Sequence, residues 1–147
     1  MPNRHPHVER GFTIIELTIV LAIASILTAM IVPRAGTFID KIEVRGAVTE
    51  IESLFSLARH AAIARGSQVT LNIDNTRGII LITAAADTIQ SRPVGAAHKV
   101  TLSANRPGIT YSPIGVGYGA ANFTLLVSRN RTTDSVLVSR LGRVRHR

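Results

Sequence analysis

A single carboxylate interrupts a long apolar segment near the start of the chain. From Phe12 to Val32, 21 residues contain no ionisable side chain other than Glu16. About 20 apolar residues are enough for a helix to cross a bilayer. A carboxylate inside such a segment costs about 2.5–3.5 kcal/mol at a helix centre and less near an end. Glu16 is therefore a candidate functional residue.

The spacing between Gly11 and Glu16 indicates a possible partner for this carboxylate. If a peptidase cleaved after Gly11, Phe12 would carry a new α-amino group four residues before Glu16, on the same helix face. The carboxylate could neutralise its own amine or that of a neighbouring copy. The second pairing would set the axial register between packed helices. The plainer alternative is a signal anchor in which Glu16 has no partner.

Arginine side chains gather at the opposite end of the chain. The last eight residues contain Arg140, Arg143, Arg145 and Arg147. If the final strand continues through Gly142, Arg143 and Arg145 share a face and lie about 6.6 Å apart along it. This is close to the ~7 Å of two steps along one nucleic-acid strand. Arg129 and Arg131, in the turn before this strand, could extend the patch.

Guanidinium groups suit bidentate phosphate contacts. No aromatic side chain lies among the C-terminal arginines for base stacking, so the predicted contacts are with the DNA backbone. From Ser53 onward, twelve Lys and Arg face only three Asp, within a total net charge of +8. This balance favours an anionic partner, either nucleic acid or an anionic surface. The alternatives are a tail that maintains solubility or contacts acidic partner subunits.

Gly11-Phe12-Thr13-Ile14-Ile15-Glu16-Leu17 resembles the processing signal of type IV prepilins and of type II secretion pseudopilins. The resemblance implies that a prepilin peptidase cleaves after Gly11 and methylates Phe12, and that Glu16 serves assembly with other pilins. It also implies that the leader lies in the cytoplasm and the domain after the inner-membrane span in the periplasm. An ordinary secretory signal would place a small-residue cleavage site after the apolar segment, where Ile31–Arg34 is a poor site.

Helical periodicity continues beyond the apolar segment. A core-facing stripe recurs at steps of three and four and ends near Arg65-Gly66, while Pro33 predicts a kink. The members of the stripe are Val44, Ala47, Val48, Ile51, Leu54, Phe55, Ala58, Ala61 and Ala62. The expected divisions are a leader over 1–11, a transmembrane and assembly helix over 12–33, an amphipathic helix over 34–65 and a β-rich domain over 66–147.

Short alternating segments follow this helix. Strands are expected near 69–74, 78–83, 99–103, 109–112, 123–127 and 135–139, with turns between them and no second helix. The predicted fold is α+β, with a long kinked N-terminal helix packed on a C-terminal antiparallel sheet. No cysteine is present, so no disulfide supports the fold. The histidines lack metal-ligand spacing, and we find no catalytic constellation and no cofactor motif in a suitable context, so no enzyme is predicted.

The order of these elements resembles the GspH/FimT-type branch of the pilin family, with a final strand in Asp134–Arg143. Gly142-Arg143-Val144-Arg145 also resembles the tails of FimT-type minor pilins associated with DNA uptake. The resemblance implies a minor type IV pilin, stored in the inner membrane and assembled into a pilus, that binds double-stranded DNA. The alternative is a minor pseudopilin of a type II secretion system. A membrane-tethered periplasmic enzyme would need a catalytic cluster.

Overall fold

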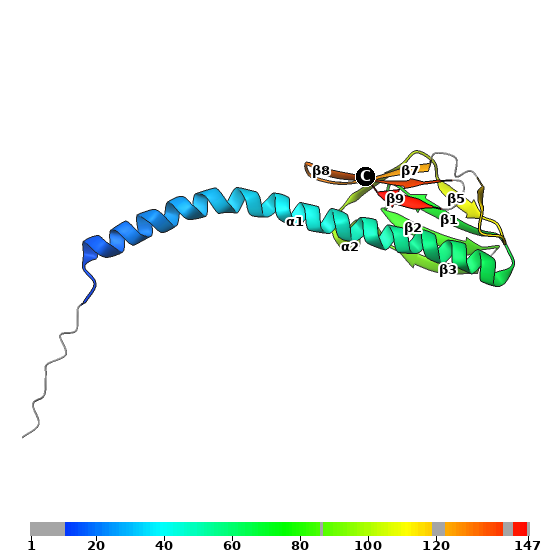
Figure 1. The fold of residues 1–147 in the computed structure, drawn as a ribbon, viewed down its shortest axis with the longest axis horizontal. Coiled ribbons are helices and arrows are strands. Elements are labelled where there is room, and N and C mark those ends of the chain that lie inside the picture. Colours follow the sequence, from blue (N-terminus) through cyan, green and yellow to red (C-terminus); the bar gives the residue numbers. More distant parts are fainter. Residues whose placement is uncertain (1–10, 86, 119–122, 140–142, 147) are drawn as a thin grey trace, which may run out of the picture. The chain divides into compact units, whose positions relative to one another are not determined.

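The computed structural model describes residues 11–85, 87–118, 123–139 and 143–146. This part of the chain contains two helices and nine strands, and it divides into two compact units after Gly36 (Figure 1). The helices are α1 Ile14–Arg65 and α2 Val94–His98. The strands are β1 Val69–Asp74, β2 Ile79–Ala84, β3 Asp87–Arg92, β4 Thr101–Ala104, β5 Gly108–Tyr111, β6 Gly117–Tyr118, β7 Phe123–Arg129, β8 Thr132–Val138 and β9 Val144–His146.

Helix α1 ends where the sequence predicts. Gly66 adopts a left-handed φ of 58°, which favours glycine because it has no Cβ. The Gly66 N–H donates to the Ile63 carbonyl and the Ser67 N–H to the Ala62 carbonyl, both at 3.3 Å. These two bonds satisfy carbonyls that the last helical turn would otherwise leave without partners. The helical assignment continues through Pro33, and the kink expected there remains a prediction.

The second half of α1 supplies one side of the hydrophobic core. Its buried residues are Val44, Ala47, Val48, Ile51, Leu54, Phe55, Ala58 and Ala62, with Ala61 partly buried, which confirms the predicted stripe. They form one cluster with the inner-facing residues of the strands, and Figure 1 shows this part of α1 running alongside them. The Phe55 and Phe123 rings meet edge to face with centroids 5.6 Å apart.

The strands form two antiparallel sheets in the described part of the chain. Sheet A has the order β3-β2-β1-β5-β6 and sheet B the order β4-β7-β8-β9. The antiparallel α+β architecture is confirmed, but the prediction of a single sheet is wrong. Alternation shows which face of a strand is buried, and it does not show which strands pair. The short helix α2 and the strands β3, β6 and β9 were also not predicted.

A buried tyrosine lies in the core at β5. Tyr111 is fully buried, and its hydroxyl has no hydrogen-bond partner among the described residues. Burial raises the pKa of Tyr111 to about 12, against a smaller lowering by the Arg59 guanidinium. The folded state therefore disfavours ionisation of this phenol. The stability that depends on the protonated Tyr111 phenol is complete below the unfolded pKa of 10 and is lost as the pH rises towards 12.

We therefore expect Tyr111→Phe to reduce the loss of stability at alkaline pH. Between pH 10 and 12, wild type should lose about 1–3 kcal/mol of unfolding free energy that Tyr111→Phe retains. At neutral pH the variant should be equal to wild type or up to ~1 kcal/mol more stable, because an unpartnered buried hydroxyl is removed. Urea denaturation at neutral pH, pH 10 and pH 12 measures both effects, and Tyr118→Phe, which changes an exposed tyrosine, is the control. Identical alkaline losses in all three proteins would contradict it.

Candidate functional site

The predicted cleavage site lies directly before α1. Gly11, Phe12 and Thr13 are exposed and non-helical. The Thr13 hydroxyl accepts a hydrogen bond from the Glu16 N–H at 3.2 Å, so Thr13 is the N-cap of α1. Thr13-Ile14-Ile15-Glu16 has the spacing of a capping box, so this start of the helix was predictable from the sequence. Glu16 is in the first turn of α1, where the positive end of the helix dipole stabilises a carboxylate.

The first part of α1 exposes its apolar side chains. This segment is long and apolar enough to cross a membrane by length and composition, and none of it is buried within the chain. Its Ser and Thr side chains donate to carbonyls of their own helix, as Ser25 does to Leu21 at 2.7 Å. Their polarity is thus satisfied without water. A continuous exposed apolar surface of this kind requires a membrane or partner helices to cover it.

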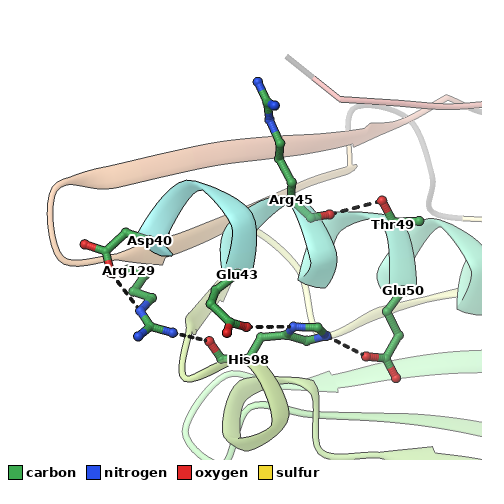
Figure 2. A network of polar contacts seen from close by, with 7 residues as sticks. All are labelled: Asp40, Glu43, Arg45, Thr49, Glu50, His98 and Arg129. Carbon is green, nitrogen blue, oxygen red and sulfur yellow. Dashed lines mark hydrogen bonds and ion pairs between the residues drawn. The ribbon is translucent and has the colours of Figure 1, made fainter. Parts of the chain in front are cut away.

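A polar network fastens the second half of α1 to the neighbouring strands (Figure 2). Asp40 is buried, with 8% of its surface exposed, and one carboxylate oxygen pairs with the Arg129 Nε at 2.9 Å. Its other oxygen accepts from Asn130 Nδ2 at 2.9 Å. Arg129 also donates through Nη1 to the His98 carbonyl at 2.9 Å. Asp40 thus holds the β7–β8 turn, and Arg129 connects this turn to α2.

The His98 ring lies between two carboxylates of α1. Its Nδ1 is 3.2 Å from Glu43 Oε2 and its Nε2 is 3.0 Å from Glu50 Oε2. Figure 2 shows both glutamates reaching the ring from the same side of the helix. A Cβ at Gly46 would lie 3.1 Å from the ring, so the small residue there allows this close approach. No group of three or more His, Cys, Asp or Glu among the described residues could hold a metal ion.

Arg143 and Arg145 belong to a hairpin rather than to one long strand. β8 ends at Val138, and β9 turns back to pair antiparallel with it, with Leu137 opposite Arg145. The Ser139 N–H donates to the Arg143 carbonyl at 3.0 Å and closes the turn. The expected single strand reaching Arg145 is therefore wrong, since Val144 pairs with Val138. Gly142, through which it was expected to continue, lies outside the described residues. The two-residue spacing still leaves both Arg143 and Arg145 exposed while Val144 packs against the core.

A contact between two polar side chains secures this last strand. His146 Nδ1 lies 3.1 Å from Glu52 Oε1 on α1, so both Val144 and His146 attach β9 to the body of the fold. This contact could not be predicted from the sequence, since 94 residues separate its partners. Because neighbouring residues of a strand point to opposite faces, Arg145 is held on the outer face of sheet B.

The other arginines of the predicted patch are arranged differently. Arg129 points into the Asp40 network with only 18% of its side chain exposed, so it is removed from the predicted DNA-binding set. Arg131 is exposed in the β7–β8 turn, six residues before Leu137 along β8. That separation is roughly 20 Å, so Arg131 does not adjoin Arg145. Arg140 and Arg147 lie outside the described residues.

Comparison with known protein families gives two matches. The model of the type II transport protein GspH matches residues 47–142. The model of the prokaryotic N-terminal methylation motif matches residues 7–32. The second match contains Gly11, Phe12 and Glu16, and the two together cover most of the chain.

Solved structures share the fold at low sequence identity. Two crystal structures of the type IV minor pilin FimU from Pseudomonas aeruginosa PAO1 have TM-scores of 0.59 and 0.62 at 14% and 16% identity. They cover 70% and 74% of this chain and 91% and 90% of FimU. The minor pseudopilin EpsH of the Vibrio cholerae type 2 secretion system has a TM-score of 0.56 at 15% identity, covering 71% of this chain and 95% of EpsH. These similarities show the pilin-like fold.

Curated relatives match over a shorter region. Two fimbrial proteins of Pseudomonas aeruginosa are 38% identical over 61 residues, which is 42% of this chain. The matched region spans 39% of the length of these relatives. Family and fold are those of structural pilins, which are not enzymes.

Proposed function

We propose that this chain, which belongs to the family of the type II transport protein GspH, is a minor type IV pilin that binds DNA during uptake. Family and fold assign the chain to the broad class of minor pilins and pseudopilins. The methylation motif implies processing by a prepilin peptidase and assembly with other pilins. The DNA-binding role is the specific part of the proposal and rests on the C-terminal hairpin.

The N-terminal segment supplies anchoring and assembly in this proposal. Cleavage after Gly11 is followed by methylation of Phe12, and the apolar part of α1 holds the subunit in the inner membrane, with the rest in the periplasm. Glu16 then pairs with the Phe12 amine of a neighbouring subunit in the fibre. The exposed, non-helical Gly11–Thr13 segment supports access by a peptidase. The unburied apolar surface of α1 supports packing against membrane and partners.

The observation that carries DNA binding is the fixed exposure of Arg143 and Arg145. Val144 and His146 attach β9 to the core and to Glu52, so Arg145 extends from an anchored strand and Arg143 lies directly before that strand. A guanidinium held in place loses less conformational entropy when it contacts phosphate. Contacts to phosphates alone carry no base sequence information, so binding should show little sequence preference.

We expect Arg143→Ala combined with Arg145→Ala to remove most DNA affinity. The full mature chain in non-ionic detergent is titrated with labelled duplexes of unrelated sequence at several salt concentrations. Wild type should give a log–log slope of about −2, since each neutralised phosphate contributes about −0.9. The double variant should keep its melting temperature, because exposed arginines contribute little to stability.

Arg77→Ala combined with Arg92→Ala is the matched control, since it removes the same charge from exposed positions in the β1–β2 turn and on β3. Equal losses in the two double variants would show that net charge, not the β9 hairpin, determines affinity.

A specific observation favours a second candidate, a minor pseudopilin of type II secretion: the matching family model is that of GspH. That function predicts no measurable DNA affinity in wild type and a secretion defect on deletion.

A further inference from the structure

We propose that the DNA-contacting surface is the whole outer face of sheet B, of which Arg145 forms one border. This inference rests on the proposed function and extends it from two arginines to a defined surface. The register of the four strands determines its members. They are Thr101 and Ser103 on β4, Thr124, Leu126 and Ser128 on β7, Thr133, Ser135 and Leu137 on β8, and Arg145 on β9.

The residues on either side of these in each strand face the core. Leu102, Leu125, Val127 and Val136 are fully or almost fully buried, which leaves the alternate positions on the outside. Leu126 and Leu137 are accordingly 43% and 42% exposed. The outer face therefore combines six hydroxyl side chains, two leucines and one arginine.

Charge distinguishes this face from the rest of the molecule. None of the eight described carboxylates lies on it. Glu16, Asp40, Glu43, Glu50 and Glu52 are on α1, Asp74 and Asp87 are on sheet A, and Asp134 is on β8. Asp134 pairs in register with buried Val127, so it lies on the inner side and lines a small groove with Arg45 and His146. Sheet A carries two carboxylates, so it suits a polyanion less well.

The composition and size of the face fit a DNA backbone. Ser and Thr hydroxyls are ordinary partners of phosphate and sugar oxygens, and they add contacts without reading bases. Strands β7 and β8 have seven residues each, which makes the face roughly 20 Å long. One strand of a duplex presents a phosphate about every 3.4 Å along its axis, so the face can meet several. Arg145 lies at one end of this face, and exposed Arg131, in the β7–β8 turn, lies at the other.

The test adds a negative charge to the face in one variant and a positive charge in another. Leu126→Glu, at the centre of the face, should weaken binding of duplex DNA roughly tenfold or more, because like charges juxtaposed at an interface are strongly unfavourable. Ser103→Arg should strengthen binding and steepen the salt slope by about 0.9, the value of one additional phosphate contact. Both variants change exposed side chains, so melting temperatures should remain near that of wild type.

Leu57→Glu and Ser56→Arg are the matched controls, because they make the same changes at exposed positions of α1. The proposal predicts that both bind DNA much as wild type does. If each face variant behaves like its control while Arg143→Ala with Arg145→Ala still loses binding, the outer face is not the contact surface and the arginines act alone. If wild type shows no salt-dependent DNA binding, the proposed function itself fails and this inference fails with it.

Discussion

Glu16→Ala is expected to be processed and inserted in the membrane normally but to be nearly absent from fibres. The substitution removes a charge from an apolar segment, so insertion becomes easier. In the proposed assembly, the Phe12 amine of the neighbouring subunit would lose its partner. Removing one member of a buried ion pair costs about 3–5 kcal/mol. At about 1.4 kcal/mol per factor of ten, incorporation should fall roughly 100-fold or more. Immunoblotting of sheared fibres against membranes measures it.

Three further variants separate charge from helix capping. Glu16→Gln keeps the size of the side chain and should fail as Glu16→Ala does. Thr13→Ala removes the hydroxyl that accepts from the Glu16 N–H, and it should incorporate nearly normally if charge is the requirement. Ser25→Ala removes a polar group whose hydrogen bond stays within its own helix, and should have no effect. Normal incorporation of Glu16→Gln would disprove the register role of the carboxylate.

Asp40→Ala is expected to lower the free energy of unfolding by about 3 kcal/mol, because it leaves the largely buried Arg129 guanidinium without its carboxylate. The Asn130 side chain loses its partner at the same time. Urea denaturation of the full chain in detergent, followed by a signal from the β-sheets, measures the change.

Two other variants test whether the loss of stability comes from the unpaired Arg129 charge. Asp87→Ala removes an exposed carboxylate of β3 and should change stability by no more than about 0.5 kcal/mol. Asp40→Leu combined with Arg129→Met should recover most of the lost stability, because both charges are replaced by apolar side chains. If Asp40→Ala is no more destabilising than Asp87→Ala, the Asp40–Arg129 pair does not fasten α1 to the β7–β8 turn.

The sequence predicted features that depend on local pattern. The apolar stripe of α1 follows helical spacing, and Gly66 marks the end of the helix, so both could be found by periodicity and capping rules. Strands such as β1 alternate strictly, because one face is buried and the other is not. Exposure of Arg143 and Arg145 also agrees with alternation about Val144, although the prediction of one continuous final strand was wrong.

Features that depend on distant contacts could not be predicted. Arg129 appears in the sequence as one more basic residue near a turn, and its partner Asp40 lies 89 residues away. His98 ends a helix of only five residues, too short for periodicity to reveal, and its carboxylate partners lie 48 and 55 residues before it. The separation of the strands into two sheets likewise depends on which strands pair, a choice that alternation leaves open.

Processing after Gly11 is the step on which methylation, membrane retention and assembly all depend. The most direct test is intact mass and N-terminal fragment analysis of protein extracted from membranes of a host that has a prepilin peptidase. The predicted result is a mature chain that begins at Phe12 and carries one methyl group on its amine. A chain that keeps Met1, or one that begins near Pro33 as after an ordinary secretory signal, would contradict the assignment as a pilin subunit.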